Sequence, residues 1–383
     1  MNFLKREPSL KEQKIFNNYY DFLDQTSFLD RIVMIMIYDF DMESSFYKDL
    51  ITKLKSSNAR IHVFKISNCS HTIENILEIC DFMEKFNINS VIAIGEDFLG
   101  EFLKAINVFY NNSSIKTLSE LEHRKHSLTY KKLKETIFIP TTGGGTEAHR
   151  YFKIIDNNFS QITIFEDSMD KIDILVLDAN IVRESSLDYV MYYIFSVIAN
   201  VIDILLIDNL DKEIKTKSLS MINKLVELLE NGEGFGNSLL FREKVISYSF
   251  SVSKMVDEVG YGILYLYGNL IEGVFSVPRN TVDALGIEFF VREIRNKNSS
   301  MKLSKCFDMS DNFEENIKKF KKIYGAKDNL SFYSLNEEMV DKVKNVALNF
   351  LYTHGIIEKY RSLNFNGELN DKLFNYYLEG IDS

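Results

Sequence analysis

Short apolar runs alternate with longer stretches of helical periodicity through the first half of the chain, and this alternation constrains the fold more than any other feature. Runs of strand length lie at residues 32–38, 61–66 and 90–95, and amphipathic stretches with helical spacing separate them at 45–56 and 72–86. Near-continuous apolar strands that are separated by helices are typical of a parallel sheet covered on both faces. The pattern therefore predicts an α/β domain with a parallel, Rossmann-like sheet of the nucleotide-binding type.

The alternation ends near Glu184, and almost no strand signal follows. Before that point we expect a helix at 98–110 and a solvated loop over the polar stretch 111–134. The sequence thus predicts two domains, an α/β domain over 1–184 and an all-helical domain over 185–383, with a cleft between them. The other expected strands lie at 136–139, 161–165 and 172–177, and the expected helices of the second domain at 187–208, 212–230, 239–272, 281–295, 311–324, 336–354 and 368–380.

Charge, cysteine usage and hydropathy indicate a cytoplasmic protein. The 45 basic and 55 acidic residues give a net charge of −10, whereas binding to a nucleic-acid backbone needs a basic face. The three cysteines lack a C-x-x-C spacing, which is typical of a reducing compartment. No apolar signal segment begins the chain, and its most apolar stretch, 192–207, is shorter than the ~20 residues that a bilayer needs. We therefore expect a buried core helix there and neither a nucleic-acid nor a membrane partner.

The sharpest local signal is the segment 137–147, in which an apolar strand runs into Pro140, Thr141, Thr142 and the three glycines Gly143, Gly144 and Gly145. Glycines after a strand let backbone N–H groups approach a phosphate or a ribose closely. Such a turn is weak evidence by itself. Its surroundings make the signal more specific.

The segment resembles the Pro-Thr-Thr-x-Gly-Thr-Gly-Ser-Glu motif of the iron-containing, group III alcohol dehydrogenases, which belong to the dehydroquinate synthase-like superfamily. The run 91–95 with Glu101 and Lys104 is similar to that family's first glycine-rich turn, and the run 174–178 to the last strand of its cofactor domain. The resemblance extends from about residue 30 to residue 383 and includes Pro278. It implies an NAD(P)-binding α/β domain, a helical domain and oxidoreductase activity.

The resemblance also implies a metal between the domains, held by one aspartate and three histidines of the helical domain. The positions that correspond to these four ligands are Ile198, Ile202, Tyr265 and Arg279. A further active-site histidine of the family corresponds to Asn269. Isoleucine has no lone pair to donate, arginine has donors only, and none of the six histidines lies between 150 and 353. We therefore expect that iron or zinc is not held here.

The first glycine-rich turn of the family corresponds here to Gly95, Glu96, Asp97 and Phe98. A carboxylate about 4 Å from a phosphate charge costs roughly 1 kcal/mol in water and about 4 kcal/mol near a protein surface. Ordinary NAD(P) binding is therefore in doubt. Gly95, together with the Thr141–Gly145 turn, is nevertheless the candidate for contacts with a nucleotide or another phosphate.

The sequence leaves two interpretations of the expected cleft open. In the first interpretation, catalysis has been lost and side chains fill the cleft. Alternatively, Arg279 pairs with a carboxylate or phosphate of a small anionic ligand that Tyr265 positions. His149 and Arg150 would then add positive charge at the rim, although we expect both at the surface.

The leading functional hypothesis is a homologue without metal-dependent activity, a pseudoenzyme that binds a ligand or a partner, or an enzyme with metal-independent chemistry. The alternative is an NAD(P)-dependent alcohol dehydrogenase or aldehyde reductase for a small or sugar-like substrate, with Tyr265 or Arg279 in place of the metal. A homodimer is expected from the family. The high usage of Lys, Asn and Ile indicates an AT-rich, bacterial genome.

Overall fold

The computed structural model describes residues 13–66, 71–130, 132–145, 149–156, 161–166, 171–182, 184–275, 277–296, 313–325, 327–333, 335 and 337–379. The chain divides into two compact units, Met1–Glu184 and Ser185–Ser383.

The first unit contains a six-stranded parallel sheet in the order β1-β8-β5-β4-β2-β3. This arrangement confirms the predicted α/β class with a parallel sheet. The strands of the sheet are β1 (Lys14–Phe16), β2 (Ile32–Ile37), β3 (Arg60–Lys65), β4 (Ser90–Gly95), β5 (Glu135–Pro140) and β8 (Ile174–Val176). The helices of this unit are α1 (Tyr19–Gln25), α2 (Ser45–Ser56), α3 (Ile73–Phe86), α4 (Asp97–Asn111), α5 (Leu118–Arg124) and α6 (Ala179–Val182), with the 3-10 helix η1 (Asp39–Glu43).

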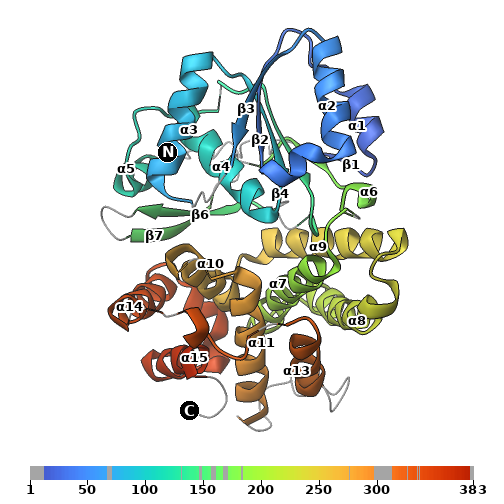
Figure 1. Ribbon diagram of the computed structural model, residues 1–383. Coiled ribbons are helices and arrows are strands. Elements are labelled where there is room, and N and C mark those ends of the chain that lie inside the picture. The colour runs from blue at the N-terminus through green and yellow to red at the C-terminus, as the bar shows by residue number, and fades with distance from the viewer. Residues whose placement is uncertain are drawn as a thin grey trace. The chain divides into compact units, whose positions relative to one another are not determined.

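Helices cover both faces of this sheet, with α1 and α2 on one side and α3 and α4 on the other (Figure 1). Val33, Ile35 and Ile37 of β2 contribute to the core under α1 and α2, together with alternate residues of β4 and β5. Met34 and Met36 point to the opposite face and are also fully buried. Burial on both faces is the reason that β2 and β4 are continuous apolar runs.

Side-chain caps fix where the helices of this unit begin. The hydroxyl of Ser44 accepts a hydrogen bond from the Tyr47 N–H at the start of α2, and that of Thr72 accepts one from the Asn75 N–H at the start of α3. Each cap satisfies a backbone donor that the helix itself leaves without a partner. Polar residues that precede apolar stretches therefore mark both helix starts.

One local expectation of this unit is wrong, and one expected strand is confirmed but lies in a sheet that was not expected. The stretch 111–134 was expected to be a loop, but it contains α5, which the Thr117 hydroxyl caps and whose Leu118 and Leu121 are buried. The strand expected at 161–165 does form, as β7 (Gln161–Glu166), but it pairs antiparallel with β6 (Tyr151–Asp156) in a separate two-stranded sheet. A strand's composition does not reveal which strand it will pair with.

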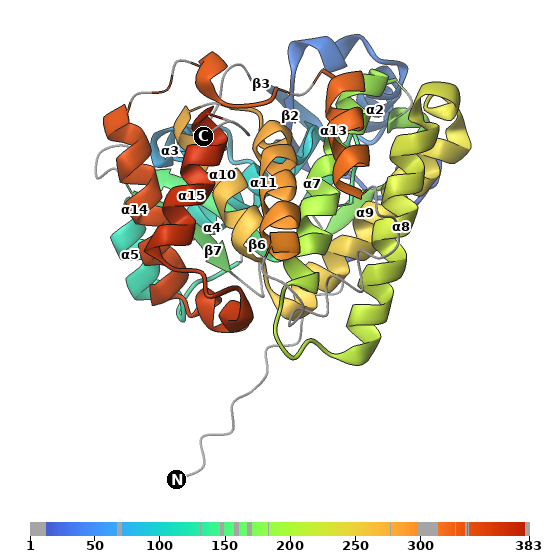
Figure 2. The same ribbon diagram turned by 90° about the horizontal axis from the view of Figure 1, so that it is seen from below.

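The second unit is built from helices, as predicted (Figure 2). Its central helix α7 packs against α8, α9, α10 and α11. The helices are α7 (Leu187–Leu205), α8 (Lys212–Phe235), α9 (Leu239–Val259), α10 (Ile263–Phe275), α11 (Arg279–Asn296), α13 (Phe313–Ile323), α14 (Glu337–Thr353) and α15 (Gly367–Glu379), with the 3-10 helices η3 (Ser331–Tyr333) and η4 (Ile356–Leu363).

The helix expected over 239–272 is in fact two helices, because the chain breaks at Gly260. Gly260 has a φ of +85°, a backbone conformation that residues with a side chain rarely adopt. The break lets α10 begin at Ile263 in a new direction. The site described below depends on the start of this helix.

Helix α7 is the one described helix that is long and apolar enough to cross a membrane. Within the unit, 72% of its most apolar window is buried, and Val190, Ile194 and Val201 have no exposed surface. A helix that is predominantly apolar and buried in this way is a core helix.

Candidate functional site

The carboxyl ends of β2 and β4 mark the point where the order of the parallel sheet reverses, since β3 follows β2 towards one edge and β5 follows β4 towards the other. In open α/β sheets, ligands bind in the crevice at such a switch point. Tyr38 to Asp41 follow β2, whereas β4 ends at Gly95 and is followed by Glu96 and Asp97. The predicted cofactor residue Gly95 therefore lies at the position that the topology favours for a nucleotide.

The turn after β5 lies beside Gly95. The Thr141 N–H donates to the Gly95 carbonyl oxygen at 2.9 Å, and Thr141 and Thr142 are buried. Gly144 and Gly145 have φ values of +71° and +98°, which explains the glycines at these positions. The structure thus brings the predicted cofactor residues together at the carboxyl ends of β4 and β5. These residues are Gly95, Thr141, Thr142 and the three glycines of the turn. Thr146 and Glu147, the last residues of the motif, lie outside the described residues.

Space beside Gly95 is limited. A Cβ atom on Gly95 would lie 2.8 Å from Leu99 Cδ1 and 3.0 Å from the ring of Tyr38. The Tyr38 ring stacks on that of Phe40, with 5.3 Å between the ring centroids. The Tyr38 ring and the Leu99 side chain therefore fill the space that a side chain at position 95 would need.

Acidic groups dominate the electrostatics of the switch point. Asp41 of η1 is buried, and burial raises the pKa of its carboxyl to about 7, with the charges of Glu96 and Glu184 adding to the effect. Glu96 is the N-cap residue of α4 and makes no side-chain capping hydrogen bond there. A helix N-terminus normally attracts anions. Here, the N-cap residue is itself acidic, and the carboxyl of Asp41 lies close enough to interact with it.

Both His149 and Arg150 were expected at the surface, and both are less exposed than expected. His149 is buried, and its Nδ1 accepts the Tyr151 N–H at 3.2 Å. Arg150 is half-buried and forms an ion pair of 2.7 Å with Glu166 of β7. The interior position of His149 was missed because the β6–β7 hairpin that follows it was not expected.

In the helical unit, a buried carboxylate connects α7 with α10. The two carboxylate oxygens of Asp203 accept the backbone N–H groups of Leu264 at 2.9 Å and Tyr265 at 2.8 Å. Gly262 is required beside this contact, because a Cβ there would lie 2.4 Å from Asp203 Cγ and 2.3 Å from the hydroxyl oxygen of Tyr360. Asp203 therefore satisfies the N-terminal donors of α10 from another helix.

Arg279 lies at the start of α11, and it contacts α10 and a residue of its own helix. Its guanidinium lies over the Tyr265 ring, 4.5 Å from the centroid, and its Nε lies 3.3 Å from an Asp283 carboxylate oxygen. Asn269 donates to the Tyr265 carbonyl oxygen at 2.8 Å. The structure therefore brings the three predicted residues Tyr265, Asn269 and Arg279 together. We call these three, with Asp203 and Asp283, the arginine cluster.

Burial controls the charge of the two carboxyls in this cluster. It raises the pKa of Asp203 to about 7, against the effect of its two backbone hydrogen bonds. It also raises the pKa of Asp283 to about 6, against the effects of the Arg279 charge and of a hydrogen bond with Ser196. One guanidinium thus lies among two buried carboxyls, which keeps the net charge of the cluster low.

Ile198 and Ile202, the other two positions taken from the resemblance, have no exposed surface and supply only apolar contacts. The polar face of α7 is formed instead by Ser196, Asn200 and Asp203. Sequence reasoning missed these three as site residues. Their i, i+4, i+7 spacing in an otherwise apolar helix was the available signal.

The donor atoms of the cluster are those of amides, carboxyls and a phenol, with a guanidinium among them. The Oδ1 atoms of Asn200 and Asn269 have no hydrogen-bond partner among the described residues. In the part of the chain that the structure describes, no three His, Cys, Asp or Glu side chains gather closely enough to hold a metal ion. A guanidinium beside a carboxylate competes with a divalent cation for that carboxylate. The described residues therefore do not fit an iron or zinc site of the usual kind.

The left-handed backbone conformation of Gly144 can be tested by substitution. The substitution Gly144→Ala places a Cβ 2.7 Å from Pro140 Cγ at a φ of +71°, and we expect it to lower the free energy of unfolding by about 2 kcal/mol. Gly234→Ala is the control, because nothing lies within 4 Å of its Cβ on α8, and it is expected to stabilise by about 0.5–1 kcal/mol. Urea unfolding measures both. Equal stability of Gly144→Ala and wild type would contradict the described turn.

The raised pKa of Asp203 predicts a pH-dependent stability. Between its ordinary pKa of 3.8 and about 7, the folded state keeps the proton and the unfolded state loses it, so stability falls as pH rises through this window. Relative to Asp203→Asn, the wild type should lose up to about 4 kcal/mol of unfolding free energy from pH 4 to pH 7. Asp188→Asn is the matched control, since Asp188 is exposed at the start of the same helix. Parallel pH profiles for wild type and Asp203→Asn would refute the assignment.

Three comparisons place the chain among known proteins. Residues 17–179 match the model of a family described as iron-containing alcohol dehydrogenase. No curated protein sequence matches the chain significantly. Among solved structures, an alcohol dehydrogenase from an archaeal halo-thermophile of a Red Sea brine pool aligns with a TM-score of 0.80 at 15% identity, over 96% of this chain and 98% of that one.

Two further structures have the same fold. The iron-containing alcohol dehydrogenase of Thermococcus thioreducens aligns with a TM-score of 0.77 at 13% identity, over 97% of this chain and 99% of that one. The maleylacetate reductase of Agrobacterium tumefaciens aligns with a TM-score of 0.69 at 13% identity, over 97% and 98%. Residues 17–179 thus match the iron-containing alcohol dehydrogenase family, and the chain as a whole has the fold of these solved structures.

Proposed function

We propose that this chain is a metal-independent homologue of the iron-containing alcohol dehydrogenases, and that its arginine cluster binds the carboxylate or phosphate of a small anionic ligand. The observation that carries the proposal is the position of Arg279, which lies on the Tyr265 ring beside Asp283. The side chain of Arg279 keeps 18% of its surface exposed, whereas that of Asp283 has none. A planar guanidinium that is held on an aromatic ring is well suited to bidentate recognition of an anion.

The donor set of the cluster supports the absence of metal chemistry. In relatives that use iron, the metal polarises the alcohol or carbonyl oxygen as a Lewis acid. Here, Arg279 supplies the positive charge at the cluster, and no histidine lies between residues 150 and 353 to replace it as a ligand. The chain is therefore proposed to have lost metal-dependent dehydrogenase activity.

Elemental analysis of the purified protein, expressed with iron and zinc supplied, tests this first part. We expect far less than one equivalent of either metal per chain, because the cluster already holds a cation of its own. Near-stoichiometric iron or zinc would refute the proposal.

Inorganic phosphate and succinate then serve as anion probes in thermal unfolding, and both should raise the Tm of the wild type but not of Arg279→Gln. Arg292→Gln on the same helix is the matched control and should keep the wild-type response.

A second candidate function keeps the enzyme class, as an NAD(P)-dependent aldehyde reductase in which Arg279 donates to the carbonyl oxygen. The observation that favours it is the retained Thr141–Gly145 turn at the switch point of the sheet, where nucleotides bind in related folds. Glu96 opposes it, and so does Asp41 above its raised pKa of about 7, since negative charge here would repel that of a pyrophosphate.

Titration with NADH and NADPH separates the two functions. The double substitution Glu96→Gln with Asp97→Asn removes two charges at the start of α4, and we expect it to bind NADH at least tenfold more tightly than the wild type. Asp39→Asn, at a neighbouring exposed carboxylate that already pairs with Lys65, is the control and should change binding less than twofold. Tight binding by the wild type that the double substitution does not improve would favour the reductase.

A further inference from the structure

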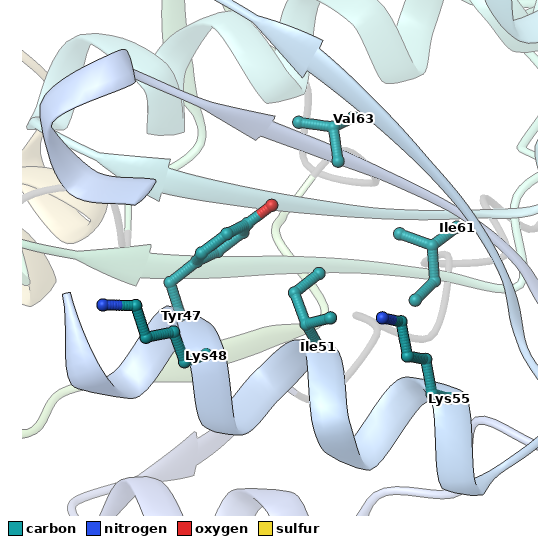
Figure 3. A pocket seen from close by; sticks show the side chains of 6 residues that line it. All are labelled: Tyr47, Lys48, Ile51, Lys55, Ile61 and Val63. Carbon is teal, nitrogen blue, oxygen red and sulfur yellow. The ribbon is translucent and has the colours of Figure 1, made fainter. Parts of the chain in front are cut away.

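A groove lies at the open edge of the parallel sheet, between α2 and β3 (Figure 3). Its volume is about 410 Å³. Tyr47, Ile51 and Lys55 are spaced four residues apart on α2 and point towards Ile61 and Val63, which are alternate residues of β3. The lining residues are Tyr47, Lys48, Ile51, Lys55, Ile61 and Val63.

Among the described residues, no strand pairs with the main chain of β3 on the groove's outer side. In the sheet, β3 pairs with β2 and with no other described strand. The N–H groups of Arg60 and Ile66 donate to carbonyl oxygens of the β2 segment at 2.9 Å. Because N–H groups alternate in direction along a strand, those of Ile61, Val63 and Lys65 point away from β2. An extended segment can therefore pair with this edge.

The floor of the groove is apolar, and its rim is basic. Val63 keeps 36% of its surface exposed, and Ile51 and Ile61 are half-buried. Lys48 is exposed at one end, 3.8 Å from the Glu43 carboxylate, and Lys55 at the other end has no ion pair among the described residues. This local positive charge contrasts with the net charge of −10 for the whole chain.

The charge of the rim decides between the occupants of such an edge. A second copy that paired through β3 would bring the same lysines close to one another, and like charges at a strand edge disfavour pairing. An acidic segment would instead find two ammonium groups at the ends of an apolar floor. Charge complementarity therefore favours a partner that is extended, apolar at alternate positions and acidic at its ends.

We propose that this edge groove binds an extended acidic segment of a partner protein, which adds as a strand to β3. Its main chain pairs with the N–H and C=O groups of Ile61 and Val63, and its apolar side chains pack against Ile51. Its carboxylates pair with Lys48 and Lys55. The groove thus serves an interaction that is independent of the arginine cluster.

A labelled peptide, acetyl-Glu-Thr-Val-Thr-Val-Thr-Glu-amide, in which the Val and Glu side chains share one face of the strand, tests the proposal by fluorescence anisotropy with the full chain. We expect saturable binding that weakens as salt rises. The double substitution Lys48→Glu with Lys55→Glu should weaken binding at least tenfold. Lys53→Glu makes half of this charge change on the face of α2 opposite the groove, and it should weaken binding less than twofold. Equal binding of a peptide with Lys in place of both Glu residues would overturn the proposal.

Hydrogen exchange of the wild type gives a readout that needs no substitution. The bound peptide should slow exchange at the amides of Ile61, Val63 and Lys65 and leave the amides of β4 unchanged. Unchanged exchange at these three positions at saturating peptide would overturn strand addition. Protection of these three amides in the absence of peptide, together with a dimer in sedimentation, would overturn it in favour of a second copy.

Discussion

Compensation of buried charge is the constraint on which the helical unit depends. Asp203 is fully enclosed, and it is tolerated because the first N–H groups of α10 donate to both of its oxygens. Arg279 in turn is held by Asp283 and by the Tyr265 ring. A charged group left without these partners would cost several kcal/mol. The positions of α7, α10 and α11 are therefore linked through a few polar contacts inside an apolar core.

In the first unit, both faces of the sheet are buried, so the polar groups lie at the ends of the strands. The switch point between β2 and β4 is where the topology leaves room for a ligand, yet Tyr38 and Leu99 crowd Gly95 and the carboxyl of Asp41 lies buried nearby. The geometry of a nucleotide turn is thus combined with an electrostatic field that opposes a pyrophosphate. This combination is the reason that we propose a changed chemistry for this chain.

The fold class followed from the sequence because burial on two faces leaves a periodic pattern. The parallel sheet and the helical unit were predicted from apolar spacing, and the Thr141–Gly145 turn was recognised from its glycines. The pairing of β6 with β7 and the short helix α5 were not, since both depend on which neighbour covers a segment. In the candidate site, Tyr265, Asn269 and Arg279 were found by resemblance, whereas Ser196, Asn200 and Asp203 of α7 were passed over in favour of Ile198 and Ile202.

The sequence by itself determined the kinds of atoms that the helical unit can offer to a ligand, because no histidine lies between residues 150 and 353 and no folding can supply one. It also determined that two carboxylates follow Gly95. Only the tertiary structure decided which side chains meet. The break at Gly260 directs the start of α10 towards Asp203, and the start of α11 places Arg279 on the ring of Tyr265. These contacts join residues far apart in the chain, and no local pattern encodes such distances.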